Sequence, residues 1–223
     1  MGIVTGLAAL NKATEPHANF DDQKGRWLNM KDGQSVKIRF LQEIDPDSPN
    51  YNKEAGLGIV GIEHKSPADY KRKAICTFED EGRCFACEQH RINPKAGWKV
   101  SPRFYINVLV DEGNGTEPYV AMMSQGTGPK SATPEISQYA LETGSITNLV
   151  WKLKRTGTNT ETNYSIIPLP TAEVKPIDFT KYELFDLAKT AVRTVVYADQ
   201  EQFYMGTVKE DSVEAATSSS VEW

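Results

Sequence analysis

The side chains best suited to chemistry in this chain are four metal-binding residues in one short stretch. Cys76, Cys84 and Cys87 are its three cysteines and lie within twelve positions, and His64 precedes them. Cysteine thiolates and histidine nitrogens are common ligands of tetrahedral zinc, and four protein ligands close a structural site. The Cys-x2-Cys pair is the most specific part, because a two-residue turn aims both sulfurs at one ion. The spacing therefore predicts one structural Zn²⁺ ion.

The fourth ligand has two candidates. Eleven residues separate His64 from Cys76, whereas His90 lies three residues after Cys87 and would face the same ion if Cys87 opens a helix. A ligand before the intervening basic loop would close that loop at both ends, which favours His64. The alternative to a metal site is a set of ordinary buried thiols. Closely spaced cysteines in a cytosol-like compartment more often bind metal, so we expect the metal.

We do not expect this site to be catalytic. The zinc-dependent nucleobase deaminases combine Cys-x2-Cys with His-x-Glu, in which the glutamate transfers protons. Here Lys65 and Ser66 follow His64, so the glutamate is missing from its place. Four filled ligand positions also leave none for a reactive water. No pair of carboxylates at metal-binding spacing stands out elsewhere, and the chain is not expected to be an enzyme.

Charge is distributed unevenly along the 223 residues, whose formal net charge is −5. Residues 64–103 carry nine Lys or Arg against five acids, a balance of +4, and residues 209–223 carry one Lys against four acids, a balance of −3. The segment around the metal ligands is therefore suited to a polyanion despite the acidic total. No run of about eighteen apolar residues is present, so we expect no membrane-spanning helix.

Alternation of apolar and polar residues predicts the elements that position these side chains. In residues 35–41, Val36, Ile38 and Phe40 would point inward and Lys37 and Arg39 outward. Further strands are expected at 59–63, 104–110, 119–124, 150–155 and 164–169, and helices at 134–143, 179–189 (capped by Asp178) and 199–205. This order predicts a mainly β fold with added helices (α+β): a five-stranded, OB-fold-like antiparallel barrel with an inserted structural zinc subdomain. A two-sheet sandwich is the alternative.

The same pattern gives the domain boundaries. We expect a flexible N-terminal arm at 1–25 and a core at 26–207 that contains the zinc subdomain, 64–100, and the C-terminal helices, 178–206. The acidic, Ser-rich segment 208–223 is expected to be a disordered tail.

The order of the metal ligands and the strand pattern resemble those of a known family. A histidine, a longer gap, a cysteine, a shorter gap and Cys-x2-Cys, set among barrel-like strands, is similar to the bacteriophage single-stranded-DNA-binding proteins of the T-even type. The likeness covers roughly residues 27–170 in layout. Three stretches look like those of actinobacteriophage relatives of the group: Lys71–Ala74, Glu81–Cys84 and Phe104–Val110.

The resemblance implies a protein that coats single-stranded DNA without sequence preference in phage replication, recombination and repair. It implies His64, Cys76, Cys84 and Cys87 as the zinc ligands and the cytoplasm of the infected bacterial host as the location. It also implies that an acidic C-terminal tail recruits replication or recombination proteins; the matching residues are Glu210, Asp211, Glu214, Glu222 and Trp223. The family's basic N-terminal arm has no clear counterpart, since residues 1–25 carry only Lys12 and Lys24.

A non-specific single-strand binder needs cations along the path of the backbone and rings on which bases stack. The candidate cations are Lys37, Arg39, Lys71, Arg72, Lys73, Arg103, Lys152, Lys154 and Arg155. The candidate rings are Tyr70, Phe78, Trp98, Tyr105 and Trp151. Trp151 shares a strand face with Leu153 and could equally belong to the hydrophobic core. Lys152 and Lys154 share the opposite face and could simply be solvated.

A zinc-containing adaptor that binds a host or phage protein such as RNA polymerase is the alternative function. The acidic total and the apolar tip of the tail are compatible with it. Titration with oligo-dT separates the two, because an adaptor would give no salt-dependent response.

Overall fold

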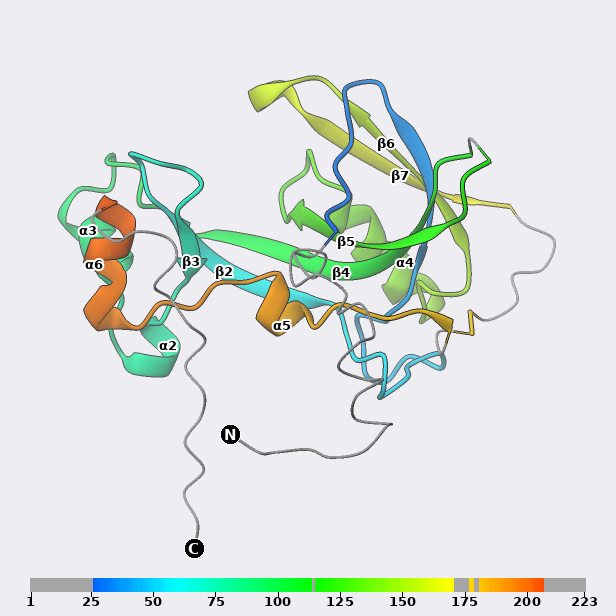
Figure 1. Ribbon diagram of the computed structural model, residues 1–223, viewed down its shortest axis with the longest axis horizontal. Coiled ribbons are helices and arrows are strands. Elements are labelled where there is room, and N and C mark those ends of the chain that lie inside the picture. Colours follow the sequence, from blue (N-terminus) through cyan, green and yellow to red (C-terminus); the bar gives the residue numbers. More distant parts are fainter. Residues whose placement is uncertain (1–25, 114, 171–176, 179–180, 207–223) are drawn as a thin grey trace, which may run out of the picture.

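Seven strands pair into one antiparallel sheet in the computed structural model, which describes residues 26–113, 115–170, 177–178 and 181–206 (Figure 1). The strands are β1 (Ser35–Phe40), β2 (Ile59–Lys65), β3 (Lys73–Ile75), β4 (Ser101–Asp111), β5 (Tyr119–Gly126), β6 (Val150–Thr156) and β7 (Asn163–Leu169). The helices are α2 (Phe78–Glu81), α3 (Phe85–Ile92), α4 (Thr133–Thr143), α5 (Leu187–Thr190) and α6 (Tyr197–Met205), with a 3₁₀ turn at Asn159–Glu161.

The long strand β4 is the centre of the sheet. Its first half pairs with β2 and its second half with β1, while β5 runs along its other edge. β3 extends the sheet beyond β2, and β6 and β7 extend it beyond β1. Among the described strands β5 pairs only with β4 and β7 only with β6, so the sheet does not close. The mixed α+β class with an antiparallel sheet is confirmed, whereas the finer assignment to a five-stranded OB-fold-like barrel is not, because the described sheet has seven strands and is open.

The main core lies on one face of this sheet. The alternation predicted for β1 is present, since Val36, Ile38 and Phe40 are buried. Trp151 from β6 packs edge-on against Phe40, with ring centroids 5.6 Å apart, and against Tyr139 of α4 at 4.7 Å. α4 thus covers this core, and it ends at Gly144, its left-handed cap, which agrees with the predicted helix end at residue 143.

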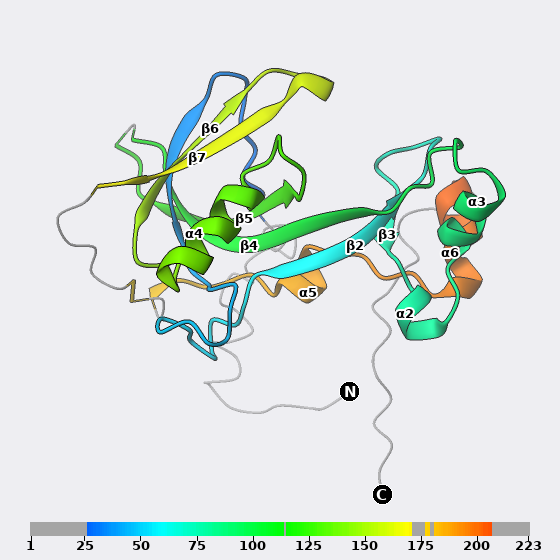
Figure 2. The ribbon, with the colours of Figure 1, turned by 180° about the vertical axis from the view of Figure 1, so that it is seen from behind.

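The C-terminal segment covers part of the opposite face. Figures 1 and 2 show it running along β4 and β2 through α5 to α6. Leu187 and Ala191 pack against Tyr105 and Met122 of the sheet. The predicted helix 179–189 is wrong over its described part, where helix begins only at Leu187. The cause is a tertiary contact: the Asn107 side chain donates to the Phe185 carbonyl at 2.9 Å and accepts from the Phe185 amide at 3.3 Å.

A second, smaller core lies beyond the end of β2 and β4, where α2, α3 and α6 gather around β3 (Figure 1). Its buried members come from residues 74–98 and 195–204, so two distant parts of the chain build it. No helix within the described ranges is long and apolar enough to cross a membrane. The predicted arm, 1–25, and the predicted tail, including Glu210 and Trp223, lie outside the described residues.

Candidate metal centre and basic sheet face

The four predicted metal ligands meet in the second core. His64 lies near the end of β2, Cys76 directly follows β3, Cys84 is the N-cap residue of α3, and Cys87 lies in the first turn of that helix. One ligand atom from each lies within 4.8 Å of all the others. The His64 Nε2 atom is 3.2 Å from the Cys87 sulfur, and the Cys76 and Cys87 sulfurs are 3.5 Å apart. These four side chains are close enough to bind one metal ion.

The two histidine candidates are separated by this geometry. His64 belongs to the cluster, whereas His90 does not. The Nδ1 atom of His64 lies 2.8 Å from the Trp98 carbonyl oxygen, which can only accept, so Nδ1 carries the proton. The lone pair of Nε2 is then directed to the sulfurs. A backbone carbonyl that fixes the tautomer of a histidine in this way is typical of metal ligands.

The three thiols differ in acidity. Burial raises the pKa of Cys84, but the polar contact with His64 and the hydrogen bonds from the amides of Cys87 and Thr77 outweigh it and lower the value to about 6. Burial is the main reason why the pKa of Cys87 is raised to about 12, and the hydrogen bond with Cys76 adds to the effect. Burial also raises the pKa of Cys76. A metal ion that binds all three sulfurs must therefore displace protons from Cys76 and Cys87.

A buried glutamine from α6 supports the centre from behind. Gln200 has no exposed surface. Its carbonyl oxygen accepts from the Phe85 amide at 2.8 Å, and its amide nitrogen donates to the Thr77 hydroxyl and the Val195 carbonyl, both at 2.9 Å. It therefore joins α6 to the residues beside Cys76 and Cys84. Sequence reasoning missed Gln200, because it lies more than a hundred positions from the cysteines and has no local signal.

Aromatic rings fill the remaining space. Trp98 packs edge-on against Phe85 and Tyr204, with centroids 5.8 and 5.4 Å away, and only 7% of it is exposed. The prediction that Trp98 stacks on bases is therefore wrong, because its ring is in the core. Tyr70 and Phe78 are exposed at 76% and 48%, so these two predicted rings are accessible.

The basic run beside the centre is mostly engaged within the protein. Arg72 donates to the Phe203 carbonyl in the last turn of α6 at 2.9 Å and pairs with Asp69. Lys73 donates to the Tyr105 hydroxyl at 3.2 Å and lies 3.5 Å from the Glu63 carboxylate. Only Lys71 of the three is exposed. Arg72 and Lys73 are thus structural contacts first, which corrects their prediction as free DNA-binding cations.

A buried carboxylate organises the neighbouring part of the sheet. Glu63 is 1% exposed and accepts from the hydroxyl of Tyr105, whose ring is fully buried. Burial raises the pKa of Tyr105, and the hydrogen bond to Glu63 raises it further, so the hydroxyl keeps its proton. Tyr105 is therefore a core residue and not a stacking ring, contrary to the prediction. Arg103 on the same face donates through Nε and Nη2 to the Ser124 hydroxyl at 3.0 and 2.8 Å.

The remaining predicted cations form one group, which we call the basic sheet face: Lys37, Arg39, Lys152 and Lys154. Lys37 lies directly opposite Lys152 in the pairing of β1 with β6, and Lys154 lies opposite Ser35. Residues opposite one another on antiparallel strands point to the same face. Lys37, Lys152 and Lys154 are exposed, and Arg39 is half-buried. Asp111, opposite Lys37 on β4, is the acidic neighbour within this register.

Two predicted residues of β6 lie elsewhere. Trp151 is 1% exposed and belongs to the main core, so its prediction as a stacking ring is wrong. Arg155 donates to the Met30 carbonyl and lies 3.5 Å from the Thr162 hydroxyl, which makes it a tie between the N-terminal segment and the β6–β7 turn. It does not join the basic sheet face.

Tyr182 is an addition that the sequence did not indicate. It lies close enough to oppose the effect of burial, which lowers the pKa of Arg39. Tyr182 is therefore a further aromatic residue near the basic sheet face.

Comparison of the chain with protein-family models, with curated proteins and with solved structures found no match.

Proposed function

We propose that this protein binds single-stranded DNA without sequence preference and that the basic sheet face holds the phosphates. The observation that carries the proposal is the pairing of Lys37 with Lys152. Like charges directly opposite on neighbouring strands destabilise a sheet. No hydrogen bond or ion pair within the described part of the chain engages the ammonium groups of Lys37, Lys152 or Lys154. A bound polyanion would attract both ammonium groups and offset the repulsion between them.

Preference for a single strand would come from rings close to cations. Unpaired bases present their faces, and stacking on an aromatic side chain contributes about 1–3 kcal/mol per base irrespective of base identity. Tyr182 is close enough to Arg39 to interact with it electrostatically, and the exposed rings of Tyr70 and Phe78 lie at the metal subdomain. The likeness of the ligand order to that of phage single-stranded-DNA-binding proteins supports the same conclusion.

The metal in this proposal is one structural Zn²⁺ ion. A set of three cysteines and one histidine suits zinc, whose structural sites are closed by four protein ligands. Bound zinc would neutralise the thiolates and cross-link β2, β3 and α3 through His64, Cys76, Cys84 and Cys87. The chain's own residues complete the arrangement, since Trp98 orients His64 and Gln200 ties α6 to the same turn. No reaction is part of the proposal.

The partners and the location follow from the same proposal. Replication or recombination proteins would be recruited by the acidic residues near the C-terminus, Glu210 to Trp223, which lie outside the described residues. The place of action would be the cytoplasm of an infected bacterium.

The proposal is tested by titrating a fluorescein-labelled dT oligomer at several salt concentrations. The logarithm of the affinity should fall with the logarithm of salt concentration, with a slope of about −0.7 for each phosphate neutralised on a single strand. Lys37→Met and Lys152→Met should each weaken binding and make the slope shallower by about 0.7. Lys95→Met, at an exposed lysine after α3, is the matched control and should change neither quantity.

Two results would contradict the proposal. Absence of any salt-dependent response from the wild-type protein would leave the zinc-containing adaptor as the better function. Equal losses in Lys37→Met and Lys95→Met would show that charge in general, and not the basic sheet face, governs binding.

A further inference from the structure

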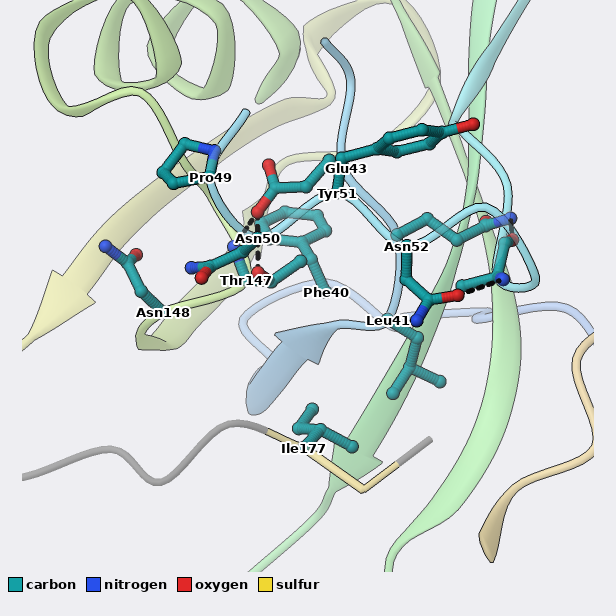
Figure 3. Close-up of a pocket in the computed structure, with 12 residues that line it drawn as sticks. Phe40, Leu41, Glu43, Pro49, Asn50, Tyr51, Asn52, Thr147, Asn148 and Ile177 are labelled. Atoms are coloured by element: carbon teal, nitrogen blue, oxygen red, sulfur yellow. Dashed lines mark hydrogen bonds between the residues drawn. The ribbon is translucent and has the colours of Figure 1, made fainter. Parts of the chain in front are cut away.

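A cavity of about 220 Å³ opens where β1 ends. Its lining includes Leu41 directly after β1, Asn50 and Asn52 in the following loop, Asn148 before β6, and Ile177 from the C-terminal segment. Figure 3 shows Asn52 and Asn148 at opposite sides of the pocket. Ligand pockets for drug-sized molecules measure about 300–1,000 Å³, so this one suits a smaller group such as a single ring system.

Leu41, on one side of the pocket, continues the row of side chains that forms the basic sheet face, whereas Phe40, also in the lining, belongs to the core face. Successive residues of a strand alternate between faces, so Leu41 points to the same side as Lys37 and Arg39. Pairing extends this far, because the Leu41 amide donates to the Asn107 carbonyl at 3.1 Å. With a rise of about 3.3 Å per residue, Leu41 lies about 7 Å beyond Arg39 along the strand. A nucleic-acid backbone held by Lys37 and Lys152 would bring a nearby base toward the mouth of the pocket.

The polar groups of the pocket suit an uncharged ligand. The acidic residue of the lining is Glu43. Its carboxylate accepts hydrogen bonds from the hydroxyls of Ser145 and Thr147 and from the amides of Ile146 and Thr147. That carboxylate is therefore fully satisfied and demands no cation from a ligand.

Two side-chain amides remain available to a ligand. No hydrogen bond among the described residues engages the amide of Asn148 or the Nδ2 atom of Asn52, whose Oδ1 accepts from the Glu54 and Ala55 amides. An Asn side chain offers both a donor and an acceptor, as the edge of a nucleobase does. The apolar surfaces of Leu41 and Ile177 suit the faces of such a ring.

We propose that this pocket takes one base of the bound strand, held by the Asn148 and Asn52 amides at its edge and by Leu41 and Ile177 at its face. The inference rests on the proposed function and extends it from phosphate contacts to a base site. A phosphate is disfavoured here, because the pocket lining contains Glu43 and neither Lys nor Arg.

The test compares two oligomers of equal length and charge: labelled dT, and the same backbone with abasic tetrahydrofuran residues. The measured quantity is the ratio of the abasic Kd to the dT Kd, obtained by fluorescence anisotropy with the full chain. Asn148→Trp fills the pocket and should lower this ratio about fivefold or more relative to wild type. Asn148→Ala removes only the amide and should lower it less. Asn93→Trp, at an exposed asparagine after α3, is the matched control and should keep the wild-type ratio.

An unchanged ratio in Asn148→Trp would overturn the base site while leaving phosphate binding, and thus the proposed function, intact. Weaker binding of both oligomers by the same factor has the same meaning, since it shows general damage and no loss of base contact. Failure of the wild-type protein to bind either oligomer would overturn the proposed function and this inference together. Thermal melting of each variant confirms that the chain is folded before the ratios are compared.

Discussion

The positive side chains of the basic sheet face and those beside the metal centre carry the same charge in different surroundings. Lys37 and Lys152 face each other across two strands and stay exposed. Arg72 and Lys73 are held by carbonyl, hydroxyl and carboxylate oxygens of their own chain. Repulsion within the first pair, which Asp111 opposite Lys37 offsets in part, raises the energy of the empty protein, and the contacts of the second pair lower it.

This difference indicates which cations are available to a ligand. A repulsive pair with no internal partner gains most from an added polyanion. A cation that caps α6 or neutralises Glu63 would have to give up that contact first. The metal subdomain therefore contributes exposed groups such as Tyr70 and Lys71 by holding their loop in place, while the sheet contributes charge directly.

The largest effect is expected from disrupting the metal centre. Structural zinc sites in small domains bind with about 10–16 kcal/mol, so the second core should lose its order when a ligand is removed. In Cys84→Ser, or after chelation, we expect amides of α3 and α6 to lose hydrogen-exchange protection while those of β4 and β5 keep it. Binding of dT should weaken less than in Lys37→Met, because the basic sheet face belongs to the other core.

Readdition of zinc is the control for this experiment. It should restore protection in the chelated wild-type protein and fail to do so in Cys84→Ser. Loss of protection in β4 and β5 as well would mean that the two regions unfold as one unit, which would remove the basis of the comparison.

The sequence indicated the metal cluster well because its information is local. Cys84 and Cys87 lie within one helical turn, and Cys76 follows a strand whose partner carries His64. Alternation likewise predicted β1 and β6, with Lys37 and Lys152 pointing away from the core. In both cases the spacing of neighbours along the chain decides the direction of a side chain.

What the sequence could not indicate depends on contacts between distant segments. β3 has three residues, too few for a period, and Lys73 within it reads as part of a basic loop. The predicted helix 179–189 is another case, because Asn107 bonds to the backbone amide and carbonyl of Phe185 that a helix would use. Tyr105 alternates with Phe104 and Ile106 of the main core and so points to the other face, where Trp27, Met122 and the C-terminal segment bury it.

A smaller effect is expected from Gln200→Ala, which separates the contribution of α6 from that of the metal. The change leaves the Phe85 amide and the Thr77 hydroxyl without their buried partner, a loss of about 2 kcal/mol. Zinc should therefore dissociate faster on transfer to a chelator, and α6 should exchange faster. Glu201→Ala, at an exposed position of the same helix, is the control. Equal dissociation rates in the two variants would show that Gln200 does not support the centre.

The smallest effects come from a reciprocal pair of substitutions that tests the comparison directly. Lys73→Met should lower the free energy of unfolding by about 1–2 kcal/mol, because Glu63, 1% exposed, loses the ammonium group 3.5 Å away. Its affinity for dT should change little. Lys37→Met should do the reverse, weakening dT binding while stability stays within about 0.5 kcal/mol of wild type.

Urea denaturation and oligomer titration on the same preparations provide the two readouts. Loss of the repulsion between Lys37 and Lys152 should stabilise the Lys37→Met variant. A clear decrease in the free energy of unfolding of this variant would therefore argue against a repulsive pair. Lys73→Met could instead weaken dT binding as much as Lys37→Met without a loss of stability. That result would show that the contact between Lys73 and Glu63 does not prevent Lys73 from binding DNA. The separation between structural and ligand-facing cations would then fail, because an internal partner would no longer predict that a cation is unavailable.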